Sequence, residues 1–164
     1  MLSVIIPTLN EEKYLPLLLD SLKAQTYRNF EIIVADAGSK DRTREIAAEA
    51  GAMVIDGGMP GVGRNKGAAA ANGDWLLFLD ADVILPPHFL RAVMDEVQAK
   101  KLDVATCAIQ PLTDKKRDKF MHGLVNTYFK ATQKFWPHAP GFCILARKNV
   151  HHAIGGFDEK IRFA

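Results

Sequence analysis

Short apolar segments of strand length alternate along this chain with segments that have the spacing of amphipathic helices. The strand-like runs are Ser3–Ile6, Glu31–Ala35, Met53–Ile55, Trp75–Leu79 and Val104–Ile109. Their enrichment in Val, Ile, Leu and Phe is typical of strands buried on both faces. Between them, apolar residues recur at helical spacing from Leu15 to Leu22 and from Phe89 to Val97. This alternation predicts an α/β fold with a mostly parallel sheet and helices on both of its faces.

The chain has the length of one ordinary domain. Its 164 residues are 48% hydrophobic and 24% charged, close to the average of globular domains. No repeat, low-complexity tract or linker divides them, so we expect a single domain over residues 1–164. The net charge of +2 argues against a nucleic-acid partner, because such a partner calls for a clustered basic face that neutralises several phosphates.

Cysteine usage and the N-terminus bear on the cellular compartment. Cys107 and Cys143 are the only cysteines, and their apolar contexts are typical of small buried hydrophobes rather than of a disulfide framework. The N-terminal residues have no basic segment and too short an apolar run for a signal peptide. We therefore expect a cytoplasmic protein, with the cytoplasmic face of a membrane as an alternative location.

The chain changes character after Gln110. Residues 111–119 are polar and rich in charge, which indicates a solvated loop. Residues 120–136 mix aromatic residues with Lys130 and Lys134. This pattern fits a segment that covers the domain, which we favour, or an amphipathic element on a membrane surface, so peripheral membrane association stays open. A last apolar run, Phe142–Ala146, predicts a further strand.

Polar residues follow four consecutive predicted strands. These strand ends read Pro7-Thr8-Leu9-Asn10-Glu11, Asp36-Ala37-Gly38-Ser39, Asp56-Gly57-Gly58 and Asp80-Ala81-Asp82. Each of them could serve a local turn or cap. In a parallel α/β sheet, however, ligands bind at the carboxyl ends of the strands. We therefore expect these residues to line a binding site.

Asp80 and Asp82 are the most informative of these residues. Two carboxylates at the end of an apolar strand repel each other and lose hydration unless a cation or hydrogen-bond donors compensate. Oxygen ligands without a His or Cys cluster suit Mg²⁺ or Mn²⁺, which complete their shells with water and substrate phosphates. The pair therefore suggests a cation bound together with a diphosphate. The plainer alternative is a turn cap at Asp82 and a salt bridge at Asp80.

The segment from Gly61 to Gly67 offers glycines for close backbone approach to a ligand, with Arg64 and Lys66 as cations for a phosphate. Its glycine spacing is one residue too long for the dinucleotide-binding fingerprint, and it follows the third predicted strand rather than the first. A nicotinamide-binding Rossmann domain therefore fits poorly.

Taken in order, Val4-Ile-Ile-Pro-Thr-Leu-Asn-Glu, Val34-Ala-Asp-Ala-Gly-Ser-Lys-Asp-Arg-Thr, Gly63-Arg-Asn-Lys-Gly and Leu79-Asp-Ala-Asp resemble the family 2 glycosyltransferases of GT-A fold. Gly155-Gly-Phe-Asp-Glu also resembles this family. The resemblance implies a GT-A (Rossmann-like) core, with residues 1–110 as the donor-binding half and residues 111–164 as the start of the acceptor-side half. It implies an inverting, metal-dependent enzyme that moves a sugar from a UDP- or GDP-linked donor to a hydroxyl of a glycan or lipid-linked glycan.

The resemblance also implies roles for individual residues. Pro7, Thr8, Asn10 and Glu11 would line the nucleotide pocket, Asp36 would bind the base or its ribose, and Gly38 would allow close backbone approach. Arg64 and Lys66 would face the phosphates or the sugar of the donor. Asp80 would lie near the ribose and the metal, and Asp82 would ligate Mg²⁺ or Mn²⁺ directly.

In this family the base that activates the acceptor is an Asp a few residues beyond the Gly-Phe-Asp-Glu segment. This chain ends at Ala164, so we assign no catalytic base within it and expect the base beyond that residue, in a longer parent. One alternative is a nucleotide-sugar binding module without turnover. Another is an anionic polyprenyl-phosphate acceptor that needs no base, although Val83-Ile84 stand where such members often have Leu-Gln. A nucleotidyltransferase is disfavoured, because no glycine- and arginine-rich loop follows the first strand.

Overall fold

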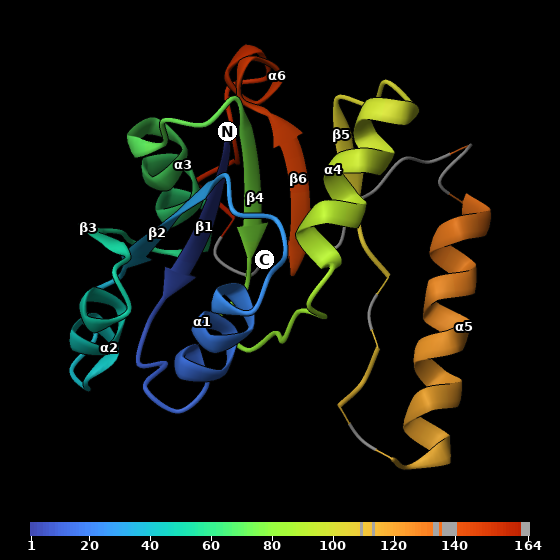
Figure 1. The fold of residues 1–164 in the computed structure, drawn as a ribbon, viewed down its shortest axis with the longest axis horizontal. Helices are drawn as coiled ribbons and strands as arrows, with labels where there is room; N and C mark the ends of the chain where they lie inside the picture. The colour runs from blue at the N-terminus through green and yellow to red at the C-terminus, as the bar shows by residue number, and fades with distance from the viewer. Residues whose placement is uncertain (109, 113, 133–134, 136–140, 162–164) are drawn as a thin grey trace.

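The protein is described here by a computed structural model that covers residues 1–108, 110–112, 114–132, 135 and 141–161. Its strands are β1 (Leu2–Thr8), β2 (Phe30–Asp36), β3 (Met53–Asp56), β4 (Trp75–Leu79), β5 (Val104–Thr106) and β6 (Cys143–Arg147). Its helices are α1 (Leu15–Lys23), α2 (Thr43–Glu49), α3 (Pro60–Ala70), α4 (Phe89–Ala99), α5 (Lys116–Thr132) and α6 (Lys148–Ala153). The strands form one sheet in the order β3-β2-β1-β4-β6-β5 (Figure 1). The predicted α/β fold with a mostly parallel sheet is confirmed.

The parallel half of the sheet sets the positions of the strand ends. β1 pairs with β2 from Leu2 opposite Phe30 to Thr8 opposite Asp36, and it pairs on its other side with β4. β3 runs parallel to β2 and ends opposite it at Asp56. The carboxyl ends of these strands therefore meet at one edge of the sheet, as the sequence predicted.

The last described strand, β6, lies between β4 and β5 and is antiparallel to both. The sequence predicted a strand at this position, over Phe142–Ala146. Its direction was not predictable, because an apolar run has the same pattern in either orientation. β5 joins the sheet through its pairing with β6.

The side chains of β1 show how the two faces of the sheet are covered. Val4 and Ile6 belong to the larger core cluster, which includes apolar residues of α1, α2 and α4. Ile5 points to the opposite face and belongs to a smaller cluster with Ala68 of α3. Helices thus pack on both faces, and the core lies around the two central strands.

Glycines bring α3 close to the sheet. A Cβ added at Gly67 would lie 2.3 Å from Cγ2 of Ile5, and one added at Gly63 would lie 3.3 Å from Cβ of Pro7. The sequence pattern assigns the glycines of this segment to the approach of a ligand. For Gly63 and Gly67 that interpretation is corrected: they are helical, and they allow the helix to lie directly on β1.

The two edge strands are more exposed than the sequence suggested. Met53 of β3 is 44% exposed and Val104 of β5 is 46% exposed. The prediction of burial on both faces is wrong for these strands, because an edge strand is covered less completely than a central one. β5 is also shorter than predicted: it ends at Thr106, and Ile109 lies outside the described residues.

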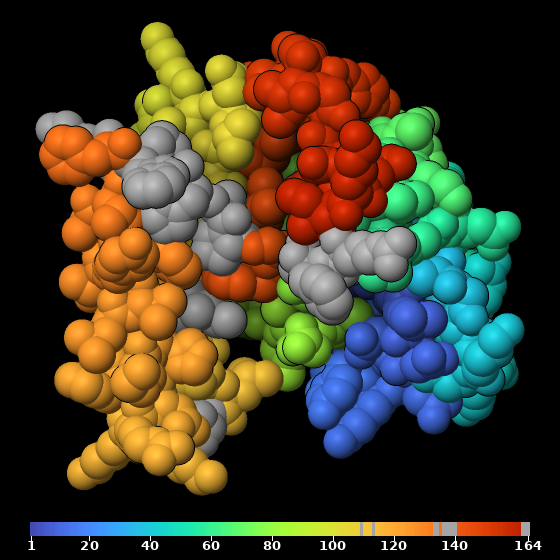
Figure 2. Space-filling view, turned by 180° about the vertical axis from the view of Figure 1, so that it is seen from behind, coloured from blue at the N-terminus to red at the C-terminus, as the bar shows by residue number. Residues whose placement is uncertain are grey.

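The region after β5 differs most from the prediction. α5 begins at Lys116, inside the segment predicted to be a loop, and none of its residues is buried. Phe120 is 65% exposed and Tyr128 is 62% exposed, so the expectation that this segment covers the domain is wrong; α5 runs along one edge of the molecule (Figure 2). Lys134 and Trp136 lie outside the described residues. Within the described ranges, none of the helices combines the length and the hydrophobicity that a membrane span requires.

Candidate functional site

A pocket of about 610 Å³ opens at the carboxyl edge of the sheet, where β1, β2, β3 and β4 end. It is lined by Pro7, Thr8, Leu9, Glu11, Ala37, Gly58, Met59, Pro60, Asp80, Ala81 and Asp82. Of the residues singled out from the sequence, Pro7, Thr8, Glu11, Asp80 and Asp82 are in this lining. The ends of β1 and β4 thus supply the polar lining, and Asn10, Asp36 and Gly38, which the sequence also singled out, are not in it.

Asp36, at the end of β2, is enclosed by hydrogen-bond donors. Its side chain is 0% exposed. Its carboxylate accepts hydrogen bonds from the backbone N–H groups of Gly38 (3.1 Å) and Ser39 (3.0 Å) and from the hydroxyls of Thr8 (3.2 Å) and Ser39 (2.5 Å). Burial acts to raise the pKa of this carboxyl, but the hydrogen bonds, first those from Ser39 and then that from Arg44, hold the pKa below its ordinary value. Asp36 is therefore ionised and fixes the turn that follows β2.

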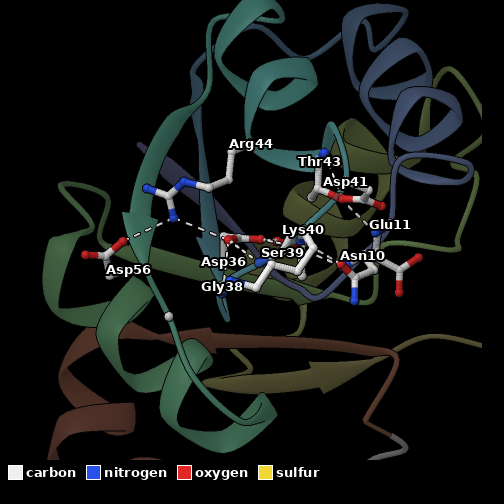
Figure 3. Close-up of polar contacts among 12 residues, drawn as sticks. Asn10, Glu11, Asp36, Gly38, Ser39, Lys40, Asp41, Thr43, Arg44 and Asp56 are labelled. Atoms are coloured by element: carbon white, nitrogen blue, oxygen red, sulfur yellow. Dashed lines mark hydrogen bonds and ion pairs between the residues drawn. The ribbon is translucent and has the colours of Figure 1, made fainter.

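Arg44, from the first turn of α2, links two strand ends. One guanidinium nitrogen lies 3.3 Å from Asp36 Oδ1 and 3.1 Å from Asp56 Oδ1, so it joins the end of β2 to the end of β3 (Figure 3). The Arg44 side chain is 43% exposed. The sequence analysis missed this residue, because no pattern distinguishes it from a surface arginine of α2.

The loop after β1 and the loop after β2 are joined by hydrogen bonds in both directions (Figure 3). The backbone N–H of Asn10 donates to Ser39 Oγ at 2.8 Å, and the N–H of Lys40 donates to Asn10 Oδ1 at 2.8 Å. The N–H of Glu11 donates to Thr43 Oγ1, also at 2.8 Å. Asn10 adopts a φ of 57°, a conformation that Asn tolerates better than most residues. These bonds fix the two loops that border the pocket.

Three carboxylates, those of Glu11, Asp80 and Asp82, line the pocket. Burial and then repulsion from Asp82, Asp41 and Asp80 raise the pKa of Glu11. Such a concentration of negative charge favours a cation. Among the described residues no three acidic, His or Cys side chains are grouped closely enough to hold a metal ion. A cation held by Asp80 and Asp82 alone would take its other ligands from water and phosphate.

The two cations of α3 lie outside the pocket lining. Arg64 is buried beneath Asp80: its Nη2 donates to Asp80 Oδ1 at 2.8 Å and to the carbonyl of Gly141 at 3.1 Å. Lys66 is exposed, and its Nζ donates to the carbonyl of Gly57 at 2.8 Å. Arg64 thus positions one of the pocket carboxylates, that of Asp80, through a hydrogen bond from outside the pocket lining. The neighbouring Asn65, which the sequence analysis passed over, bonds to Phe157.

Comparison with known sequences identifies related chains. The family model described as Glycosyl transferase family 2 matches residues 3–155. A 4,4'-diaponeurosporenoate glycosyltransferase of Staphylococcus haemolyticus is 42% identical over 120 residues, which cover 67% of this chain and 32% of that relative. This chain spans about a third of the length of the curated relatives it matches.

Comparison with solved structures finds the same architecture. TarS 1-349 of S. aureus superposes with a TM-score of 0.78 at 25% identity, over 99% of this chain and 52% of TarS 1-349. The mannosyltransferase PcManGT from Pyrobaculum calidifontis, solved in complex with GDP-Man and Mn²⁺, superposes with a TM-score of 0.74 at 21% identity, over 96% of this chain and 47% of that one. These likenesses confirm the predicted GT-A fold.

Proposed function

Because this chain belongs to glycosyl transferase family 2, we propose that its pocket binds the diphosphate of a nucleotide sugar together with a divalent cation. The observation that carries the proposal is the grouping of Glu11, Asp80 and Asp82 in a cavity of about 610 Å³. That volume lies within the range of roughly 300–1,000 Å³ typical of small-molecule sites. A diphosphate entering beside three carboxylates needs a cation between the like charges.

Asp82 and Asp80 are the residues that would hold Mg²⁺ or Mn²⁺. Asp82, in the pocket lining, is exposed, and the Asp80 side chain is 40% exposed. The bound cation would neutralise the charge that develops on the diphosphate as the sugar leaves. The complex of PcManGT with GDP-Man and Mn²⁺ supports this proposal.

The nucleoside of a UDP- or GDP-linked donor would lie along the ends of β1 and β2. Pro7 and Thr8 would contact it, and Asn10 would hold the loop beside it. Asp36 would contribute to the base site by fixing the turn after β2, because its own carboxylate is enclosed. Gly38, at a φ of 89°, would let the backbone of that turn approach the ligand.

The reaction we propose is transfer of a sugar to a hydroxyl of a glycan or lipid-linked glycan. The acceptor oxygen forms a bond to the anomeric carbon while the bond from that carbon to the diphosphate breaks, and in-line attack inverts the configuration. The acceptor proton passes to a base. We assign the base to none of the described residues: Asp158 and Glu159 are exposed and do not line the pocket, and Glu159 accepts a hydrogen bond from Asn65.

A nucleotide-sugar binding module is the second candidate, because the proposed donor pocket lies among the described residues and we assign no base to any of them. The two functions differ in turnover. Release of nucleoside diphosphate from a panel of UDP- and GDP-sugars, with Mn²⁺ and glycan or lipid-linked acceptors, would support the transferase. Binding of the donor without release of diphosphate would support the module.

A thermal-shift titration with UDP, GDP and TDP, each with and without Mn²⁺, tests the pocket directly. At a ligand concentration of ~100 times the dissociation constant, binding adds about 2.7 kcal/mol to the stability of the folded state. This corresponds to a rise in Tm of roughly 5–11 °C for a domain of this size. We expect the rise for one diphosphate, and only with Mn²⁺.

Asp82→Asn removes the proposed ligand charge with little change in shape, and we expect it to abolish the Mn²⁺-dependent rise. Asp95→Asn, at an exposed position of α4, removes the same charge away from the pocket and should retain the full rise. An Mn²⁺-dependent rise that survives in Asp82→Asn would contradict the proposed cation site. The absence of a rise with every diphosphate would contradict the proposed function.

A further inference from the structure

Arg64 connects the donor pocket to a second part of the molecule. Its side chain is 2% exposed, and its guanidinium lies 5.3 Å from the centre of the Phe157 ring. Its Nη2 bonds to Asp80 and to the carbonyl of Gly141, while its Nε is buried without a hydrogen-bond partner among the described residues. A buried cation needs a compensating charge, and Asp80 supplies it.

Asn65, the next residue of α3, fixes the backbone around Phe157. Its Nδ2 donates to the carbonyl of Phe157 at 2.9 Å, and its Oδ1 accepts from the N–H of the same residue at 2.9 Å. The Nδ2 also lies 2.9 Å from Glu159 Oε1. One side chain thus satisfies both backbone groups of Phe157 and holds a neighbouring carboxylate.

The backbone around Phe157 is shaped to fit Asn65. Gly155 and Gly156 adopt φ values of 81° and 76°, which most residues avoid. A Cβ at Gly156 would lie 2.5 Å from Asn65 Oδ1. The segment Gly155–Glu159 therefore packs against α3 in one defined position, and Figure 2 shows this C-terminal part of the chain beside α3.

We propose that Arg64 and Asn65 are positioning residues that couple occupancy of the donor pocket to the position of the Gly155–Glu159 segment. The proposal rests on the proposed function, because occupancy here means a diphosphate and a cation at Asp80 and Asp82. Asp80 carries one charge, which a bound cation and Arg64 would share. With a cation held at Asp80, the Arg64 guanidinium would depend more on the Gly141 carbonyl and the Phe157 ring. Asn65 holds the backbone of Phe157 so that its ring lies beside the guanidinium.

The test combines hydrogen exchange with the thermal shift, on the full chain. Exchange is followed by mass spectrometry in a peptide covering residues 155–161. It is measured for the free protein and for the protein with Mn²⁺ and the diphosphate that raises its Tm. For the wild type we expect binding to slow exchange in this peptide by about threefold or more, since ordered segments are protected. Turnover is not needed for this measurement.

Asn65→Asp is the informative variant, because an aspartate cannot donate to the Phe157 carbonyl and it repels Glu159. We expect faster basal exchange in the 155–161 peptide and no slowing on binding, with the thermal shift retained. Adding Glu159→Gln removes the repulsion and supplies a donor to the introduced carboxylate, so it should restore part of the slowing, which general destabilisation would not predict. Asn149→Asp, at an exposed position of α6, makes the same chemical change away from the segment and should behave as the wild type.

Arg64→Lys tests the other half of the connection and serves if Asn65→Asp does not fold. It keeps the charge but lacks the guanidinium fork that reaches both Asp80 and Gly141. We expect no slowing of exchange in the 155–161 peptide when the diphosphate and Mn²⁺ bind. Slowing equal to that of the wild type in both Asn65→Asp and Arg64→Lys would overturn the coupling, as would a wild-type thermal shift without any change in exchange. No thermal shift with any of UDP, GDP or TDP would refute the proposed function and the coupling together.

Discussion

Replacing Gly67 by alanine tests how closely α3 is packed on the sheet. On the native backbone the added Cβ would lie 2.3 Å from Cγ2 of Ile5 and 3.4 Å from two further atoms of that side chain. Ile5 is 0% exposed and belongs to β1, which has a strand on each side. It therefore has no free space into which it could turn, and either the helix or the strand must shift.

The expected cost follows from two opposing terms. Overpacking in a closed core costs about 1–3 kcal/mol, and the upper end applies here because both partners are held by regular structure. Alanine is the better helix former by about 1 kcal/mol. We therefore expect a net loss of about 2 kcal/mol in the free energy of unfolding of Gly67→Ala, which corresponds to a fall in Tm of roughly 4–8 °C.

Urea and thermal unfolding followed by circular dichroism measure this change. Gly123→Ala is the matched control: Gly123 lies inside α5, and a Cβ there would have nothing within 4 Å, so its transition should come no lower than that of the wild type. A Gly67→Ala protein as stable as the wild type would refute the reasoning, because it would mean that α3 can move away from β1 at no cost.

Three further predictions concern the strand-end loops and the cysteines. Asp36→Asn should lower the free energy of unfolding by about 1.5–3 kcal/mol at pH 7; although burial acts to raise the pKa of Asp36, hydrogen bonds hold it below its ordinary value. Its stabilisation is therefore lost as the pH falls below about 3.9, and urea titrations of wild type and variant should converge there; a constant difference would contradict this account. Asn10→Ala should lower the free energy of unfolding by about 1–2 kcal/mol, and by more than Asn10→Gly does, because both lose the bond to Lys40 but only alanine keeps a β-carbon at a φ of 57°. If urea unfolding showed the glycine variant to be the less stable of the two, this explanation would be wrong. The hydrogen bond with Cys107 and burial raise the pKa of the Cys143 thiol, whereas the pKa of Cys107 is lowered, so a thiol reagent should label Cys107 first in the native protein; equal native rates would disprove this.

The position of the pocket was predictable because it depends on few features. Alternating strand and helix patterns imply a parallel sheet, and parallel strands bring their polar ends to one edge. Thr8, Asp36 and Asp80 therefore met at that edge without any information on their contacts. The roles proposed for individual residues, such as Asp82 as a metal ligand, stay predictions.

The contacts that orient the pocket were not predictable. Arg64 reads in the sequence as a cation beside glycines, and that pattern is the same whether the side chain meets a phosphate or is buried beneath a carboxylate. Asn65 forms its bonds with a segment about ninety residues away, which no local pattern reports. Likewise, the apolar residues of α5 predict a helical face, but they do not predict that this face stays exposed.

The place of β6 between β4 and β5 has a consequence for synthesis on the ribosome. β4 is apolar along its whole length, from Trp75 to Leu79, and β6 pairs with one of its edges. Roughly sixty residues separate β4 from β6 in the sequence. At a translation rate of ~5–20 residues per second, β6 is therefore synthesised on the order of 3–12 s after β4, and this edge of β4 is unpaired until then. A nascent chain thus carries an unpaired hydrophobic strand edge for seconds, which makes this interval the one in which a ribosome-associated chaperone would have most to protect.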